Sequence, residues 1–325
     1  MKEELQTFTD LINKEIENLP LHGNPEELYE PIRYILQLGG KRLRPLLALL
    51  AYSLYKENPI DIIKPAVAVE VFHNFTLMHD DIMDQAPLRR GKATVHQKWN
   101  NNIAILSGDV MMVKVYELLL EIDSPLLKKI LCEFNKCASE VCEGQQLDMN
   151  FEEISFVSED EYLHMINLKT AVLLGFSLQM GAMLGGADES SCKLLYEFGK
   201  NMGIGFQLKD DLLDVYADNS KFGKLLGGDI IANKKTFLLI KALQEARGQE
   251  KNELETWLQK NQFEPNEKVA AIKNIYDNLQ VKEITENRVQ EYFSKSLKSL
   301  QLLKVKEEKK YLLQSFATYL IKREE

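Results

Sequence analysis

Two aspartate-rich segments with the same internal spacing constrain this chain more than any other feature of its sequence. The segment DDIMD begins at Asp80, and the segment DDLLD begins at Asp210, 130 positions further on. Residues four apart share one face of a helix, so Asp80 projects together with Asp84. Asp210 projects together with Asp214 for the same reason. Each segment also follows an apolar run, where carboxylates are costly unless a cation neutralises them.

The residue types at these positions point to a divalent cation. Magnesium binds one or two carboxylates, and completes its shell with waters and the phosphate oxygens of a substrate. We predict that the first and last aspartates of each segment hold magnesium around a diphosphate. Asp81 and Asp211 lie about 100° further around their helices, and we expect them to be secondary ligands at best. A solvated acidic surface is the alternative, but both segments have apolar flanks.

The rest of the chain favours one all-α domain that covers residues 1–325. Glycine and proline are sparse, at 17 and 9, and apolar residues recur mostly at helical spacing. Pro25, Pro45 and Pro65 are placed like helix starts, and Ser158 with Glu161 forms a capping-box pattern. Pro87 and Gly91 predict a loop. We expect helices at about 25–38, from 45, at 65–84, 102–120, 158–184 and 191–215, and from 235 onward with a break near 265.

Charge and cysteine usage exclude several functions and locations. The net charge of −9 argues against non-specific nucleic-acid binding. The four cysteines form no CxxC pair, which predicts free thiols in a reducing compartment. No secretory signal and no stretch of about 20 apolar residues is evident, so we expect a cytoplasmic protein without a transmembrane segment.

An acidic protein that binds an anion must gather its cations locally. The segment GGKRLRP at 39–45 places three positive charges in a tight loop, and RRGK at 89–92 follows the first acidic segment. Guanidinium groups match phosphate geometry, so these two loops predict a second anion site without metal. Lys169 lies inside an apolar helix and must find an anion or reach solvent. His73 lies two helical turns before Asp80, on nearly the same face.

Five motifs in order carry a resemblance to a known family. They are GGKRLRP, HDDIMD with PLRRG, LKT, GFQLKDDLLD, and a lysine-rich segment with GGD. The chain resembles the trans-type polyprenyl synthetases, the farnesyl and geranylgeranyl diphosphate synthases. This resemblance implies a helical bundle around a deep central cavity (the isoprenoid synthase fold), a homodimer, and three Mg²⁺ ions in each active site. It also implies condensation of isopentenyl diphosphate with dimethylallyl, geranyl or farnesyl diphosphate.

The resemblance further implies a role for each matching residue. The metal ligands would be Asp80, Asp84, Asp210 and Asp214. The allylic diphosphate would be held by Arg89, Lys169, Lys224 and Lys234. Isopentenyl diphosphate would be held by Lys41, Arg44, His73 and Arg90. Thr170 and Gln207 would face the developing carbocation, and Phe206 would help to wall the reacting centre. The insertion of one residue near Lys224 makes Lys234 the less certain match.

Product length is predicted from the residues before the first acidic segment. Phe75 is five residues before Asp80, and the small Thr76 is four before, which resembles geranylgeranyl diphosphate synthases of the archaeal type. Phe72 lies one turn deeper and could also block the cavity. Farnesyl diphosphate therefore stays open as the product, and ordinary core packing stays open as the role of both phenylalanines.

Two other classes of protein are compatible with part of the pattern. A terpene cyclase shares one DDxxD segment, but its second metal motif differs and it would have no use for GGKRLRP. A non-catalytic subunit of a heteromeric prenyl synthase would usually have lost one acidic segment, and both are intact here.

Overall fold

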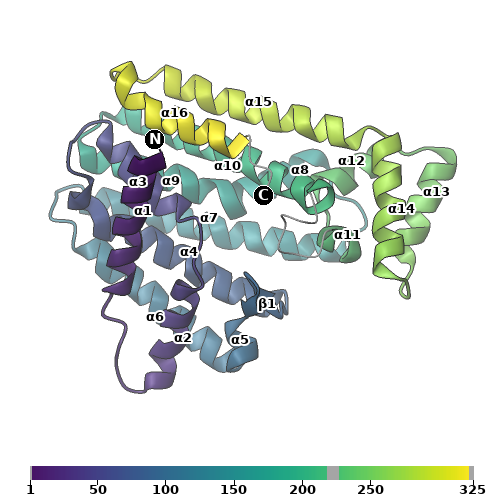
Figure 1. Cartoon of the computed structure of the whole chain (residues 1–325), viewed down its shortest axis with the longest axis horizontal. Helices are drawn as coiled ribbons and strands as arrows, with labels where there is room; N and C mark the ends of the chain where they lie inside the picture. Colours follow the sequence, from purple (N-terminus) through teal and green to yellow (C-terminus); the bar gives the residue numbers. More distant parts are fainter. Residues whose placement is uncertain (1, 218–226, 322–325) are drawn as a thin grey trace. The chain divides into compact units, whose positions relative to one another are not determined.

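The computed structural model describes residues 2–217 and 227–321, and these form an almost entirely helical protein (Figure 1). The all-α prediction is confirmed. The chain divides into two compact units, which are described one at a time below. The first contains residues 1–138, 173–199 and 302–315, and the second contains residues 139–172, 200–301 and 316–325. The single domain around a central cavity stays a prediction.

The first unit is built mainly from the N-terminal helices, with α4 packed along α6 and against α3. Glycine allows one close approach here, because a Cβ on Gly181 of α9 would lie 2.1 Å from the carbonyl oxygen of Ala48. The elements are α1 (Lys2–Glu17), α2 (Glu26–Gln37), α3 (Leu43–Ser53), the 3₁₀ helix η1 (Pro59–Ile62), α4 (Ile63–Met83), β1 (Leu88–Arg89), β2 (Lys92–Ala93), α5 (Val95–Lys98), α6 (Asn101–Leu120), the first part of α7 (Leu127–Glu153), and α9 (Val172–Gly185).

The segment after the first acidic cluster differs from the predicted loop. Strands β1 and β2 pair in an antiparallel hairpin, with Leu88 opposite Ala93. The two residues of its turn, Arg90 and Gly91, have φ values of 52° and 72°. Positive φ at both central positions is typical of the tight turns that join two antiparallel strands. The hairpin fixes where Arg89 and Arg90 lie.

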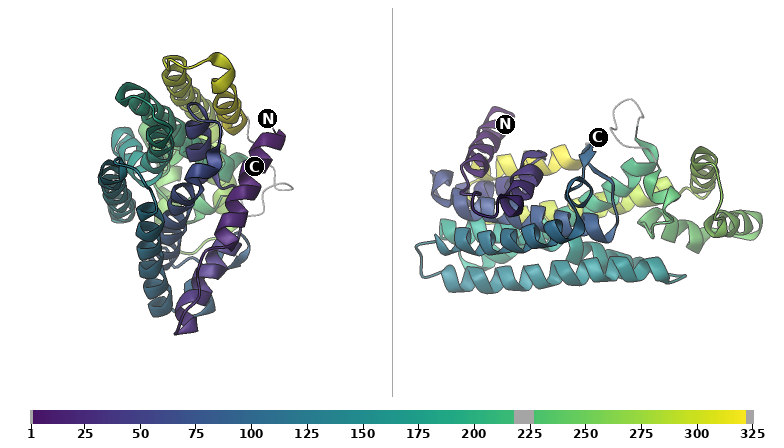
Figure 2. Two further views of the ribbon diagram at one scale, coloured as in Figure 1. Left: turned by 90° about the vertical axis from the view of Figure 1, so that its left-hand side faces the viewer. Right: turned by 90° about the horizontal axis from the view of Figure 1, so that it is seen from below.

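The second unit carries the second acidic cluster on α10. Helices α12, α14 and α15 pack on one another, and α13 lies beside α14 (Figure 2). Ser158 and Glu161 form the predicted capping box at the start of α8. The elements are the last part of α7, α8 (Glu159–Ile166), the π-helical turn η2 (Asn167–Ala171), α10 (Glu189–Tyr216) from residue 200 onward, α11 (Gly228–Ile231), α12 (Phe237–Glu245), α13 (Gly248–Gln259), α14 (Pro265–Asn278), α15 (Val281–Gln301) and the end of α16 (Glu307–Ile321); the first parts of α10 and α16 belong to the first unit.

One continuous helical stretch, Glu159–Gly185, is long and apolar enough to cross a membrane. Its apolar window is 78% buried inside the protein. A core helix of a water-soluble protein passes the same test of length and composition, so this stretch is weak evidence for a membrane span.

Candidate active site

The first acidic cluster lies at the C-terminal end of α4. Asp84 caps the helix, and its amide donates to the carbonyl oxygen of Asp80 at 2.8 Å. The helical turn is therefore kept between the two residues, which lie on one face as predicted. Asp80 is partly buried, whereas Asp84 is exposed. Two carboxylates therefore lie one helical turn apart at the C-terminal end of α4.

The middle aspartate of this cluster is committed to an arginine. Asp81 is 2% exposed and accepts from Nε of Arg89 at 2.8 Å and from Nη2 at 2.7 Å. This forked ion pair joins α4 to the β1–β2 hairpin. It holds the Arg89 side chain beside the cluster, where the sequence predicted a phosphate ligand.

Arg44 lies in the first turn of α3, where its Nε is buried although the residue as a whole is partly exposed. Burial is the main reason that the pKa of Arg44 falls to about 10. Its Nε has no hydrogen-bond partner within the described residues. A buried donor of this kind is costly unless an acceptor arrives, and an anion is the strongest acceptor. Lys41 is exposed on the loop that precedes α3.

His73 lies within this basic cluster. Burial first, and then the positive charges of Arg44, Arg90, Arg89 and Arg42, hold the pKa of His73 well below its ordinary value. The imidazole is therefore neutral at physiological pH. A neutral ring in a field of arginines donates one hydrogen bond without adding charge.

Arg90 contacts the basic loop directly, because its Nη1 donates to the carbonyl oxygen of Gly39. A Cβ at Gly40 would lie 2.9 Å from Nη2 of Arg90. The four residues predicted to hold isopentenyl diphosphate thus all lie in the first unit. They are Lys41, Arg44, His73 and Arg90.

The second acidic cluster lies near the C-terminal end of α10. Asp210 and Asp214 are partly buried one turn apart, and the amide of Asp229 donates to Oδ2 of Asp214 at 3.1 Å. The middle residue, Asp211, is 4% exposed and accepts from the hydroxyl of Tyr162 at 2.5 Å and the amide of Phe237 at 3.3 Å. Burial, with repulsion from Asp229, raises the pKa of Asp211 to about 7.

Lys169 finds its anion inside the protein. Nζ donates to Oδ2 of Asp148 on α7 at 2.6 Å. Lys169 belongs to the π-helical turn of residues 167–171, and such turns are frequent at functional sites. Gly144 makes room for this turn, because a Cβ there would lie 2.3 Å from the amide nitrogen of Lys169.

The two residues predicted to face a carbocation lie side by side. Thr170 donates from its hydroxyl to Oε1 of Gln207 at 3.2 Å, and Nε2 of Gln207 donates to Oδ1 of Asp211 at 3.4 Å. Phe206 precedes Gln207 on α10 and is partly buried. Lys234 is exposed just after α11, and Lys224 lies outside the described residues.

The three residues proposed to limit product length differ in burial. Phe72 is fully buried, and its ring meets that of Phe134 edge to face at 5.2 Å. Phe75 is partly exposed, and its ring meets that of His79 edge to face at 4.7 Å between ring centroids. Thr76 is partly exposed and donates to the carbonyl oxygen of His73.

The donor set fits magnesium. Among residues 2–217 and 227–321, no group of three or more His, Cys, Asp or Glu side chains gathers to hold a metal. Each cluster instead offers two carboxylates, and magnesium takes one or two of these and fills its remaining positions with water and phosphate oxygens. When bound, the ions would neutralise charge on a departing diphosphate.

Several residues that organise the site were not predicted from the sequence. Asp148 was missed although it lies three residues after Gln145 in a polar stretch, and Tyr162 and Glu70 carry no motif. Their partners are 21, 49 and 28 residues away along the chain. Only the folded chain brings such pairs together.

Comparison with known proteins agrees with this geometry. The sequence model of the polyprenyl synthetase family matches residues 25–278. Geranylgeranyl pyrophosphate synthase of Geoglobus acetivorans is 40% identical over 316 residues, which cover 97% of this chain and 96% of that protein.

Solved structures give the same result. A crystal structure of geranylgeranyl pyrophosphate synthase is similar with a TM-score of 0.94 and 42% identity, over 99% of both chains. The geranylgeranyl pyrophosphate synthetase of Pyrococcus horikoshii Ot3 is similar with a TM-score of 0.93 and 33% identity, over 99% of this chain and 98% of that one. This chain is a prenyltransferase with the all-α fold of isoprenyl diphosphate synthases. It belongs to the polyprenyl synthetase family, whose members generally depend on Mg²⁺ and act on isoprenoid diphosphates.

Proposed function

We propose that this enzyme condenses isopentenyl diphosphate with allylic diphosphates and ends at geranylgeranyl diphosphate. The product is supported by relatives named for it at 40% and 41% identity. The chemistry rests on one observation above all, the carboxylate pair at the end of a buried helix in each unit, Asp80 with Asp84 and Asp210 with Asp214.

The four aspartates would hold three Mg²⁺ ions in each active site. Their one-turn spacing supports this role, because it places two carboxylates on one face at each helix end. Asp81 and Asp211 are instead buried against Arg89 and Tyr162. Arg89, Lys169 and Lys234, with Lys224, would contact the allylic diphosphate. Each cation that stays with the leaving group lowers the barrier to ionisation of the allylic carbon–oxygen bond.

The basic loop would hold isopentenyl diphosphate. Arg44 supports this role, since its buried Nε is a donor that an anion would satisfy. Lys41, His73 and Arg90 would complete the site. The double bond of isopentenyl diphosphate would then attack the allylic cation, and the proton would leave to the released diphosphate.

Thr170 and Gln207 would stabilise the cation through their oxygen atoms. Their mutual hydrogen bond fixes both side chains, so the dipoles need not reorganise during reaction. Phe206, on α10, would shield the cation from water. No protein nucleophile takes part in this scheme.

The enzyme would act as a homodimer. Helix α6 exposes Ile105, Leu106 and Val113 although its opposite face is buried in the first unit. A helix that is apolar on all sides is normally covered on all sides. A second copy of the same chain would cover this face. We place the dimer in the cytoplasm.

Product analysis tests this function and separates it from its rivals. The purified chain would be incubated with Mg²⁺, isopentenyl diphosphate, and dimethylallyl, geranyl or farnesyl diphosphate in turn, and the products would be identified by mass. A twenty-carbon diphosphate from all three primers is expected, whereas a fifteen-carbon end product would identify a farnesyl diphosphate synthase. A hydrocarbon from an allylic diphosphate alone would identify a cyclase, and no turnover by the chain alone would identify a non-catalytic subunit.

A further inference from the structure

Arg42 carries one of the three positive charges of the basic loop, yet its side chain turns inward. It is 4% exposed, and Nη1 donates at 2.9 Å to Glu70 on α4, which is itself buried. Nη2 donates to the carbonyl oxygen of Leu36 on α2 at 2.7 Å, and Nε donates to Oδ1 of Asn13 on α1 at 3.1 Å. One guanidinium therefore ties the loop to three helices.

The backbone of the loop needs such an anchor. Gly39, Gly40 and Arg42 have φ values of 80°, 141° and 47°. A left-handed conformation is unfavourable for a non-glycine residue, so it persists only where the surroundings fix it. At Arg42 the three hydrogen bonds of the side chain supply that constraint.

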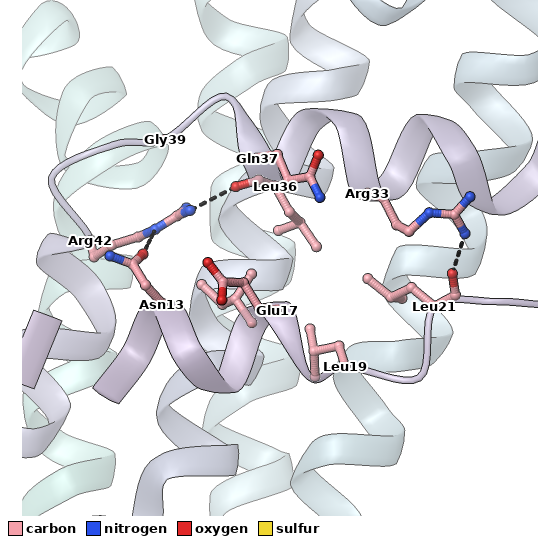
Figure 3. Close-up of a pocket in the computed structure, with 10 residues that line it drawn as sticks. Asn13, Glu17, Leu19, Leu21, Arg33, Leu36, Gln37, Gly39 and Arg42 are labelled. Atoms are coloured by element: carbon pink, nitrogen blue, oxygen red, sulfur yellow. Dashed lines mark hydrogen bonds between the residues drawn. The ribbon is translucent and has the colours of Figure 1, made fainter. Parts of the chain in front are cut away.

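The loop is not closely packed against helix α1. A pocket of about 220 Å³ lies between the end of α1, the segment around Leu19–Leu21, the end of α2 and the loop itself. Figure 3 shows the Arg42 side chain reaching from the loop toward Asn13 and Leu36 at the edge of this pocket. The guanidinium thus replaces close packing as the link between the loop and α1.

Glu70 also balances the charges around the loop. Its negative charge acts on Arg44 and Arg90 as well as on Arg42. Because Arg42 is paired, it adds no free positive charge to the site, and Lys41 and Arg44 remain on the same short segment to meet an anion.

We propose that Arg42 is a positioning residue for isopentenyl diphosphate, held by Asn13, Leu36 and Glu70 so that the loop presents Lys41 and Arg44 to the diphosphate. Arg42 itself does not touch the substrate. The inference rests on the proposed role of the loop, and it adds the N-terminal helix α1 to the parts of the protein that determine substrate affinity.

Asn13 gives the sharpest test, because its replacement leaves the buried Arg42–Glu70 pair intact. Asn13→Ala removes one acceptor, and we expect the KM for isopentenyl diphosphate to rise roughly three- to tenfold, which matches the typical net contribution of one hydrogen bond. The KM for the allylic substrate, kcat and the melting temperature should stay near wild type. Asn13→Asp keeps an acceptor oxygen and should restore the KM.

Arg33→Gln is the matched control. Arg33 lines the same pocket and donates to the carbonyl oxygen of Leu21, but it makes no bond to the loop (Figure 3). Its replacement should leave the KM for isopentenyl diphosphate within about twofold of wild type. A rise equal to that of Asn13→Ala would show that the pocket wall as a whole matters, and would overturn the specific role of Arg42.

Arg42→Lys provides a second test, since lysine keeps the charge but lacks the planar fork that reaches three acceptors at once. We expect a rise in KM of about tenfold or more, with little further rise when Asn13→Ala is added. Normal KM values in Asn13→Ala and in folded Arg42→Lys would overturn the proposal. If Arg42→Lys does not fold, the comparison of Asn13→Ala with Asn13→Asp tests the proposal by itself.

Lys41→Ala and Arg44→Ala separate the two levels of the argument. If they raise the KM for isopentenyl diphosphate while Asn13→Ala and Arg42→Lys do not, only the positioning role fails. If none of the four substitutions changes this KM, the loop does not bind isopentenyl diphosphate and the proposed function of the loop fails as well.

Discussion

Arg89 donates two hydrogen bonds to the carboxylate of Asp81, from Nε to Oδ2 at 2.8 Å and from Nη2 to Oδ1 at 2.7 Å. The middle residue of the first acidic cluster is therefore committed to an ion pair within the protein, and it holds the Arg89 side chain in place. Its neighbours Asp80 and Asp84 keep the one-turn spacing that suits magnesium. If the proposed metal sites are correct, the three acids at this helix end divide into two roles, with Asp80 and Asp84 for metal and Asp81 for Arg89.

This division predicts a graded response to substitution in the first cluster. Asp80→Ala should abolish turnover, with a loss of at least about a thousandfold, because a metal ligand is removed. Asp81→Asn should lower kcat/KM for the allylic substrate by roughly 10- to 100-fold, since Arg89 loses a charged partner. Steady-state kinetics at saturating Mg²⁺ checks both, with circular dichroism as the control for folding. Equal losses in the two variants would contradict the division.

The second cluster should divide in the same way. Asp210→Ala should abolish turnover while the fold survives. Tyr162→Phe removes the hydroxyl that donates to Asp211 and should lower the free energy of unfolding by about 1–3 kcal/mol, because a buried carboxylate loses its donor. Urea unfolding of both variants measures their stability, and steady-state kinetics measures the turnover of Asp210→Ala. Normal activity in Asp210→Ala would count against the metal assignment.

The sequence predicted much of this fold because its signals are local. The predicted starts near Pro25 and Pro65 agree with α2 and α4, and the capping box of Ser158 is formed. Helix α1 was not predicted, although Leu5, Phe8, Ile12 and Ile16 recur at helical spacing among its polar residues. The hairpin at 88–93 was missed because Pro87 and Gly91 mark a turn equally well in a loop.

The candidate site was less predictable, because its side chains are organised by distant partners. The apolar surroundings of Lys169 predicted a role for it, the family resemblance implied Thr170 and Gln207, and the structure places all three in the second unit. Spacing could not show that Arg42 turns inward to Glu70, nor that Lys169 meets Asp148. Such contacts depend on how helices pack, and no local pattern encodes them.

His73 should make stability fall in mild acid. Its pKa in the folded protein is depressed by burial and by the surrounding arginines, while in the unfolded chain it stays near 6.5. The folded state thus binds fewer protons, so this contribution is present above pH 6.5 and is lost as the pH falls below it. The loss is at most about 1.4 kcal/mol per pH unit. Urea unfolding at pH 7.5 and 5.5 should show a smaller difference for His73→Gln than for wild type.

The π-helical turn at Lys169 depends on a missing side chain. Gly144→Ala would place a Cβ 2.3 Å from the amide nitrogen of Lys169, a contact that forces one backbone to move. We expect a loss of about 1–3 kcal/mol in stability, as for other overpacked sites, together with a lower kcat. Cys142→Ala, at an exposed position of the same helix α7, is the control and should change neither. An active, stable Gly144→Ala enzyme would mean that the turn adapts freely.

Phe72 and Phe75 should separate packing from control of product length. Phe72 is fully buried against Phe134, so Phe72→Ala should cost about 3–5 kcal/mol of stability whatever it does to the product. Phe75 is partly exposed on the same helix, so Phe75→Ala should lengthen the product by at least one five-carbon unit while the melting temperature changes less. Mass analysis of the products made from isopentenyl and farnesyl diphosphate measures product length. Thermal unfolding measures the change in stability. If neither substitution changes the length, the residues that stop elongation lie on another helix.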